Sequence, residues 1–307
     1  MKILITGGAG FIGSHVADGF IQEGHEVVII DNLSMGRLEN VNPEATFYLM
    51  DIRSAELDKV FEKEKPEAVC HHAAQMDVRM SVTNPLFDAQ VNVLGTLHLL
   101  QLCIKYGVKK FLFASTGGAV YGEQEVYPCD ETHPTRPISP YGITKLTTEK
   151  YLYYFQKEFD LKYLILRYAN IYGPRQNHRG EAGVIAIFTH KLLRGEIPII
   201  NGDGTQTRDY VFVGDVVQAN LKGLNYQEND IFNIGTGIET DVNTLFRTLN
   251  SLTGSKSQEK HGPEKPGEQL RSAILSKKAA EKLSWRPGIT LEDGLTQTVA
   301  FFRSLVK

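Results

Sequence analysis

The sequence has few of the residues that hold together small secreted or metal-dependent proteins. Only three of its 307 residues are cysteine, Cys70, Cys103 and Cys129, and no two of them form a CxxC pair. Such sparse cysteines predict reduced thiols rather than a disulfide framework, and with them a cytoplasmic location. The nine histidines include no HxxxH pair beside a carboxylate, so we expect no catalytic metal.

Long apolar runs and a surplus of one charge are also missing. The first apolar stretch is broken at Gly7, which is too short for a membrane span, and we expect no membrane association. The net charge of −3 argues against a nucleic-acid-binding surface. The 42% hydrophobic and 22% charged residues are typical of a globular chain with one large domain or two unequal ones.

Apolar runs alternate with longer amphipathic stretches in the first part of the chain, which is the pattern of βα units on a parallel sheet. Strands are predicted at 3–6, 26–31, 45–50, 68–71, 110–115 and 162–168, and helices at 11–23, 87–106, 141–159, 188–196 and 242–254. After about residue 170 the alternation is lost. We therefore predict an α/β fold, with a Rossmann-type doubly wound parallel sheet over 1–170, to which some later segments return, and a smaller C-terminal α/β substrate lobe mainly over 171–307.

Three glycines, Gly7, Gly10 and Gly13, lie between the first predicted strand and the first predicted helix. Glycines at this spacing permit a tight turn and let the backbone approach a pyrophosphate, which then faces the free N–H groups of the helix. Asp31 ends the second predicted strand, where a carboxylate can accept from a ribose 2′-hydroxyl and repel a 2′-phosphate. The set predicts NAD rather than NADP. The alternative is a plain turn followed by a strand-end aspartate.

Tyr141 and Lys145 lie four residues apart at the start of a predicted helix, so their side chains share one face. A neighbouring ammonium, with the positive nicotinamide of bound NAD, favours the phenolate. We therefore expect the pKa of Tyr141 to be lowered towards neutrality and Tyr141 to act as a general base. YxxxK is also common on plain helix surfaces. The catalytic interpretation is favoured by Ser115 and Thr116, whose hydroxyls end a predicted strand and can bond the reacting oxygen. Capping of the strand end is the alternative.

Eight segments together resemble the extended short-chain dehydrogenase/reductase family, and most closely its UDP-hexose 4-epimerases. They are TGGAGFIGSH, DNLS, HHAAQ, STGGAVYG, SPYGITK, RYANIYGPRQ, NGDGTQTRDYVFV and KPGEQLRS, in the family's order and approximate spacing. The resemblance implies a redox-neutral reaction. Tyr141 takes the proton of the sugar's C4 hydroxyl while hydride leaves for NAD, and hydride returns to the other face of the turned 4-keto sugar. NAD is therefore expected to be held tightly.

The resemblance also implies which residues contact the cofactor and the UDP-sugar. On the cofactor side it adds Phe11, Ile12, Asn32, Asp51, Ile52, Ala73, Ala74, Gln75, Asn92 and Tyr168 to the glycines, Asp31, Tyr141 and Lys145. On the substrate side it implies Thr116, Tyr141, Asn170, Arg208, Lys265, Arg271 and Ser272. A homodimer through the predicted helices 87–106 and 141–159 is implied as well.

Departures from the family's patterns bear on the reaction. Gly117 and Gly118 stand where dehydratases carry an Asp-Glu pair and decarboxylases a Glu, so neither reaction is expected. The STGGAVYG loop has one extra residue, so Thr116 is preferred over Ser115 as the catalytic hydroxyl, but both stay open. Ser272 stands where glucose-restricted relatives have a bulky Tyr. UDP-N-acetylhexosamines are therefore expected beside UDP-glucose and UDP-galactose.

Two further points stay open at this stage. Lys265 replaces the family's usual Arg, which keeps a charge but loses the bidentate fork, and Arg271 is expected to compensate. A 4-keto-sugar reductase and a non-catalytic NAD sensor are the alternative functions. The preference of Asp31 for NAD weighs against the reductase, and the intact Tyr141 and Lys145 weigh against the sensor.

Overall fold

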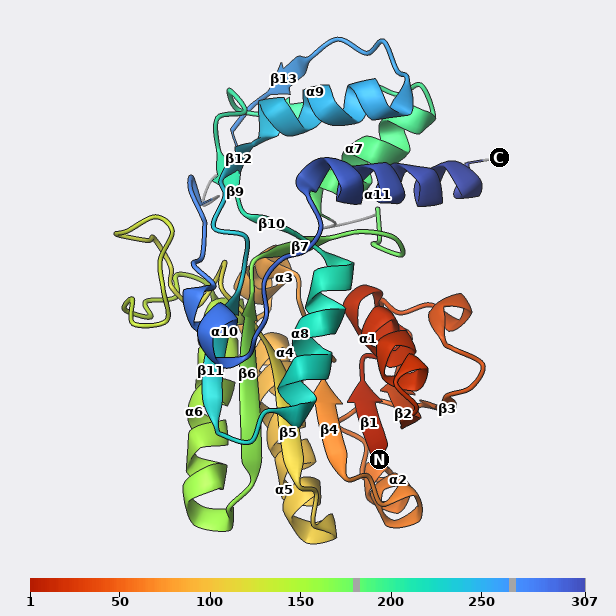
Figure 1. Ribbon diagram of the computed structural model, residues 1–307, viewed down its shortest axis with the longest axis vertical. Helices are drawn as coiled ribbons and strands as arrows, with labels where there is room; N and C mark the ends of the chain where they lie inside the picture. Colours follow the sequence, from red (N-terminus) through yellow and green to blue (C-terminus); the bar gives the residue numbers. More distant parts are fainter. Residues whose placement is uncertain (179–182, 265–268, 307) are drawn as a thin grey trace.

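Seven parallel strands form the central sheet of the computed structural model, which describes residues 1–178, 183–264 and 269–306 (Figure 1). Their order is β11-β6-β5-β4-β1-β2-β3. The strands are β1 Lys2–Thr6, β2 Glu26–Asp31, β3 Thr46–Leu49, β4 Ala68–His71, β5 Lys110–Thr116, β6 Lys162–Tyr168 and β11 Asp230–Ile234. The order reverses between β1 and β4, and ligands of doubly wound sheets bind beyond the carboxyl ends of the strands at such a point. The predicted fold class is confirmed.

Helices cover both faces of this sheet. The helices of the described residues, on the sheet and in the lobe, are α1 Phe11–Gln22, α2 Leu57–Glu64, α3 Val78–Thr83, α4 Pro85–Ala89, α5 Gly95–Tyr106, α6 Pro140–Phe159, α7 Val184–Leu193, α8 Val213–Asn225, α9 Val242–Thr253, α10 Lys277–Lys282 and α11 Leu291–Leu305. The short η1 is Leu38–Asn40, and the π-helix η2 is Gln90–Leu94.

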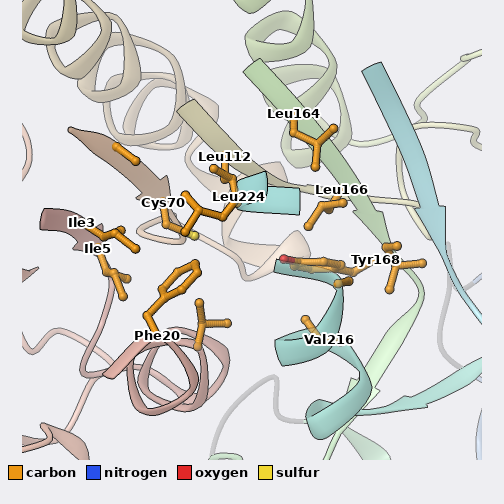
Figure 2. Close-up of a cluster of buried hydrophobic side chains, with 14 of the residues drawn as sticks. Ile3, Ile5, Phe20, Cys70, Leu112, Leu164, Leu166, Tyr168, Val216 and Leu224 are labelled. Carbon is orange, nitrogen blue, oxygen red and sulfur yellow. The ribbon is translucent and has the colours of Figure 1, made fainter. Parts of the chain in front are cut away.

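Successive side chains of a strand point to opposite faces of the sheet, so the side chains of the apolar strands contribute to two separate cores. Ile3 and Ile5 pack with Phe20 of α1 and with α8 on one face, as Figure 2 shows. Leu4, between them, packs with α2, α5 and α6 on the other face. Gly19 lets α1 approach α8 closely, because a Cβ there would lie 2.4 Å from a methyl of α8.

The later part of the chain builds a smaller lobe from α7, α9 and α11, which share a third apolar core. Its short strands pair two by two: β7 Asn170–Tyr172 with β10 Tyr210–Phe212, β9 Thr207–Arg208 with β12 Thr240–Asp241, and β8 Ile199–Asn201 with β13 Lys260–Gly262. In Figure 1 this lobe lies above the sheet, on the side to which the strand arrows point. The carboxyl ends of the strands, where a ligand is expected, are therefore on the side of the sheet on which this lobe lies.

Most predicted elements match the structure within two residues, with two differences. The predicted helix 87–106 is three consecutive pieces, α4, η2 and α5, because a π-turn at Gln90–Leu94 interrupts the α-helical ladder. The helix predicted at 188–196 is α7, which begins and ends earlier along the chain. Two unpredicted elements, α8 and β11, return to the sheet after the chain has entered the lobe.

Candidate functional site

The glycine turn after β1 has no room for side chains. Gly7 has φ +71°, and a Cβ there would lie 2.6 Å from the Ala73 nitrogen. A Cβ on Gly13 would lie 2.2 Å from the Gly7 oxygen. Helix α1 starts after Gly10, which has no side chain to cap the first N–H groups of Phe11 and Ile12. These groups are therefore available to an anion, and the turn fits a pyrophosphate.

Asp31 is fixed beside this turn at the end of β2. It is 7% exposed, and its carboxylate accepts from the backbone nitrogens of Ala9 (3.0 Å) and Leu33 (2.8 Å). Each oxygen keeps a second lone pair for a hydroxyl of a ligand. A Cβ on Gly36 would come within 3.0 Å of both oxygens, so glycine is needed there too. The arrangement fits a ribose beside the glycine turn.

A second carboxylate, Asp51, lies on the same edge of the sheet. Asn32 donates to its Oδ2 at 3.0 Å, and Arg53 binds both of its oxygens at 2.8 Å. The hydrogen bond from Arg53 is the main cause that lowers the pKa of Asp51 to about 2. Asp51 is therefore an ionised acceptor near neutral pH, next to the buried Ile52.

The loop after β4 is tied to the π-helix by a reciprocal pair of hydrogen bonds. The Gln75 nitrogen donates to Asn92 Oδ1 (2.8 Å), and Asn92 Nδ2 donates to the Gln75 oxygen (2.9 Å). The Ala73 nitrogen donates to Thr6 Oγ1 (3.3 Å), which holds the start of this loop, and with it Ala74, against β1. The predicted cofactor residues of this loop and Asn92 thus lie together. A π-turn at such a place is typical of functional sites.

Tyr168, at the end of β6, lies mainly in the core. Figure 2 shows its ring among the buried side chains, near Leu166 and Val216. Its hydroxyl accepts from Asn220 Nδ2 at 2.9 Å, and its ring stacks on His72. Burial raises the pKa of Tyr168 well above the ordinary value, so its phenol stays protonated. Its expected place beside the nicotinamide stays a prediction.

The structure brings Tyr141 and Lys145 together on the first turns of α6. Ser139 caps this helix by accepting from the Gly142 nitrogen (3.2 Å), with Pro140 in its first turn. The Tyr141 nitrogen donates to Ser81 Oγ at 3.2 Å. Lys145 Nζ lies 5.9 Å from the centre of the Tyr141 ring and donates to the Ala114 oxygen at 2.8 Å.

The pKa values of this pair are governed mainly by burial. Burial raises the pKa of Tyr141, and the negative charge of Asp88 raises it further. In the protein alone desolvation dominates, and the ammonium bonds a backbone carbonyl instead of the phenol. The lowering expected from Lys145 together with bound NAD stays a prediction. Burial lowers the pKa of Lys145 to about 8, although the negative charges of Asp88 and Glu149 act to raise it.

The two candidate hydroxyls at the end of β5 have different surroundings. Ser115 is 4% exposed and donates to Glu149 Oε1 at 2.6 Å. Thr116 is partly exposed, and its Oγ1 has no hydrogen-bond partner within the described ranges. A Cβ on Gly118 would lie 3.9 Å from both Thr116 Oγ1 and Asn170 Oδ1. Thr116 and Asn170 therefore border the same open space.

The two arginines predicted to contact UDP both interact with other groups of the protein. Arg208 lies on β9, and its Nη1 donates to the Thr207 oxygen at 2.8 Å. Arg271 Nε donates to Glu239 at 2.9 Å, and its guanidinium lies 4.0 Å from the centre of the Tyr127 ring. The charge of Arg271 is thus already paired, which leaves its compensating role a prediction.

Two more substrate-side predictions concern the segment that includes Arg271. Ser272 is 4% exposed, and the next residue, Ala273, donates its N–H to Gln124 Oε1 at 3.1 Å. Position 272 is thus packed against the loop that follows β5. Lys265 lies outside the described residues.

The sequence interpretation missed two buried carboxylates, Asp88 and Glu149. Asp88 precedes Asn92 by four residues, and Glu149 follows Lys145 by four, so each shares a helical face with a predicted site residue. This spacing was the available signal. Their roles depend on partners from other elements, which the sequence does not display.

Two features are missing from the described residues. No helix there is long and apolar enough to cross a membrane. No group of three or more His, Cys, Asp or Glu side chains in the same ranges could hold a metal ion.

Comparisons with known proteins agree with the geometry. The model of the NAD-dependent epimerase/dehydratase family matches residues 3–235. A Methanocaldococcus jannaschii protein, named a putative UDP-glucose 4-epimerase, is 47% identical over 302 residues, 98% of each chain. The solved UDP-glucose 4-epimerase of Thermotoga maritima with UDP-glucose is 51% identical, with a TM-score of 0.98 over the whole of both chains. The Methanobrevibacter ruminantium UDP-N-acetylglucosamine 4-epimerase, in complex with UDP-N-acetylmuramic acid, is 35% identical, with a TM-score of 0.94 over 99% of this chain and 98% of that one. The predicted resemblance and the predicted use of NAD are confirmed.

Proposed function

This chain belongs to the NAD-dependent epimerase/dehydratase family, and we propose that it is a UDP-hexose 4-epimerase that interconverts UDP-glucose and UDP-galactose. The observation that carries the proposal is that Thr116 ends β5, that Lys145 on the first turns of α6 bonds the Ala114 oxygen of the same strand, and that Tyr141 shares this helix face. The full-length similarity to proteins named UDP-glucose 4-epimerase supports it.

In this proposal the chain's own residues accept and return a proton, and hydride transfer is the chemistry that the cofactor would supply. NAD, which the glycine turn and Asp31 would hold, would supply the hydride chemistry at the sugar's C4. Tyr141 accepts the proton of the C4 hydroxyl and gives it back, and Thr116 donates a hydrogen bond to the same oxygen. Since burial holds the pKa of Tyr141 high, its phenolate needs positive charge nearby, and Lys145 supplies part of it.

The residues after Thr116 favour epimerisation over elimination of water. Elimination needs a further acid or base beside the sugar, and Gly117 and Gly118 offer none. A Cβ on Gly117 would lie 2.5 Å from Ile274 Cδ1, so a larger residue does not fit there without movement. In this proposal the 4-keto sugar is therefore reduced again rather than dehydrated.

We infer that the substrate range includes UDP-N-acetylhexosamines. Asn170, Arg208, Arg271 and Lys265 are proposed to hold the UDP part, which leaves the sugar free to turn. Ser272 is proposed to face the sugar's C2 side and to leave room there for an acetamido group. The similarity to a UDP-N-acetylglucosamine 4-epimerase supports this wider range.

One incubation tests the proposed function. The purified protein receives UDP-galactose or UDP-N-acetylgalactosamine without added cofactor, and both the epimer and the absorbance of reduced nicotinamide are followed. Formation of the epimer without net reduced cofactor supports the proposal. A stoichiometric requirement for NADH would replace it with a 4-keto-sugar reductase, and bound NAD without any product would replace it with a sensor.

We also propose a homodimer through α4, η2, α5 and α6. Large apolar side chains on these elements are exposed: Leu86 76%, Leu94 58%, Ile143 51% and Tyr154 49%. Exposed apolar side chains gathered on neighbouring helices mark interaction surfaces. Light scattering of the Leu86→Arg and Leu94→Arg variants tests this, since each places a charge in the proposed interface. Unchanged mass of both variants would contradict it.

The three cysteines support a reducing, cytoplasmic location for the enzyme. Cys70, Cys103 and Cys129 are buried and unpaired. Burial raises the pKa of the Cys129 thiol to about 12, so this group stays a protonated thiol. Fractionation of the source cells tests the location.

A further inference from the structure

Asp88 of α4 is a fully buried carboxylate that the proposed chemistry does not use. It is 0% exposed and accepts three hydrogen bonds. Gln75 Nε2 (2.9 Å) and Asn92 Nδ2 (3.0 Å) donate to its Oδ1, and Thr144 Oγ1 donates to its Oδ2 at 2.8 Å. One side chain thus joins the loop after β4, the π-helix η2 and the helix α6.

The donors to Asp88 belong to the two sides of the candidate site. Gln75 and Asn92 are predicted cofactor residues and bind each other's backbone and side chain. Thr144 lies between Tyr141 and Lys145 in the chain, and its Oγ1 lies 3.0 Å from the backbone carbonyl oxygen of Tyr141. A shift of Asp88 would therefore move the cofactor-side loop relative to the helix that carries Tyr141.

Asp88 also differs in charge balance from the other buried carboxylate of this region. Glu149 is bound by Arg167, whose Nη2 lies 2.6 Å from Glu149 Oε2 and whose Nε lies 3.0 Å from Oε1. Asp88 is bound by two amides and a hydroxyl, which carry no charge. Its own charge is therefore offset less than that of Glu149, and it acts on Lys145 across the site.

Two imidazoles that interact with Lys145 are neutral. His71 and His72, at the end of β4, face the Lys145 charge. Burial lowers the pKa of His71, and it lowers that of His72 to about 3, so both imidazoles are uncharged near neutral pH. Asp88 and the paired Glu149 are then the anions that act on Lys145.

We propose that Asp88 is a positioning residue for the Tyr141–Lys145 pair: it fixes the cofactor-side loop against α6 and supplies the buried negative charge that faces the ammonium. The inference rests on the proposed proton transfer by Tyr141. The charge of Asp88 raises the pKa of both Tyr141 and Lys145, so its removal lowers both.

The Asp88→Asn variant tests the proposal, because an amide keeps the shape and removes the charge. We expect kcat to fall by about tenfold or more, with KM for the UDP-sugar within about threefold. Both limbs of the pH profile of kcat should move to lower pH by roughly 0.5–1 unit, because removal of a buried unit charge changes the pKa values of neighbouring groups by about this amount. A role in folding alone would lower kcat without moving the limbs, and that outcome would overturn the proposal.

A titration that does not depend on turnover separates this inference from the proposed function. The phenolate absorbance of Tyr141, identified by difference from Tyr141→Phe, should titrate at lower pH in Asp88→Asn than in the unmodified protein. This shift is expected even if the protein epimerises nothing. An unshifted titration would overturn the electrostatic role.

Two further variants complete the design. Asp77→Asn is the matched control, since it also removes a carboxylate from a residue whose backbone binds Gln75, but this carboxylate caps α3, where asparagine caps equally well. It should leave the pH profile in place, and the same shift there would overturn the assignment to Asp88. Should Asp88→Asn fail to fold, Thr144→Val breaks the link to α6 and keeps the charge. Unchanged turnover of Thr144→Val would then count against positioning.

Discussion

The two hydroxyls at the end of β5 give opposite predictions for Thr116→Val and Ser115→Ala. Thr116 Oγ1 borders the open space at Gly118. In the proposed mechanism it donates a hydrogen bond to the sugar's C4 oxygen, on which negative charge develops. Loss of one such donor costs about 2.7–4 kcal/mol of transition-state stabilisation. We therefore expect Thr116→Val to lower kcat by roughly 10²-fold or more, with KM little changed and the melting temperature within about 2 °C.

Ser115→Ala should instead affect stability. Ser115 is buried, and its hydroxyl donates at 2.6 Å to Glu149 Oε1, which keeps a second donor in Arg167. A buried hydrogen bond to a charged acceptor contributes about 1.5–3 kcal/mol. At roughly 2–4 °C per kcal/mol for a protein of this size, the melting temperature should fall by about 3–12 °C, with kcat within about threefold.

The assay compares both variants with the unmodified protein under identical cofactor content. Initial rates are measured at saturating UDP-galactose and UDP-glucose, NAD is quantified after denaturation, and unfolding is followed by circular dichroism. The reasoning is refuted if Ser115→Ala loses as much kcat as Thr116→Val while its melting temperature stays unchanged. That result would make Ser115 the catalytic hydroxyl.

Three other substitutions have clear expected results. Tyr141→Phe should reduce turnover by about 10³-fold or more and leave the NAD content unchanged, since the phenol is the proton carrier; substantial activity would exclude Tyr141 as the acid/base. Ser272→Tyr should lower turnover of UDP-N-acetylhexosamines at least about tenfold while UDP-hexoses stay within about threefold, with Ser272→Ala as the control; equal effects on both classes would count against a C2-side role. Glu149→Gln should lower the free energy of unfolding by about 3–5 kcal/mol, because Arg167 keeps a buried charge without its partner, whereas Glu149→Leu with Arg167→Met should recover most of the loss in urea titrations. A double variant as unstable as the single one would contradict that account.

The central sheet was predictable because its strands are buried on both faces. Such strands appear in sequence as continuous apolar runs, and β2 is one example. The glycine turn was predictable for a steric reason, since Gly7 and Gly13 have no space for a Cβ. These features depend on contacts that any chain of this topology must make, so local sequence is enough to reveal them.

Features that depend on a single inserted residue or on distant pairing were not predictable. The π-turn Gln90–Leu94 leaves the apolar periodicity of the predicted helix almost unchanged, yet it lies where Asn92 meets Gln75. Strand β11 is short and begins with Asp230, and it is a strand because β6 offers a free edge for pairing. Propensity in such a short segment is overridden by its tertiary context.

The least predictable part of the site is its electrostatics, although its residues are the most recognisable. The spacing of Tyr141 and Lys145, together with bound NAD, predicts a lowered tyrosine pKa, but the spacing contains no information about desolvation, which raises the pKa in the protein alone. Lys145 is itself turned to a backbone carbonyl, and its charge is balanced by Asp88 and by Glu149, the latter already paired with Arg167. The basicity of Tyr141 thus depends on side chains from α4 and β6 as well as on its own helix. A YxxxK pair identifies the proton carrier, and the buried charges around it decide the pH at which that carrier works.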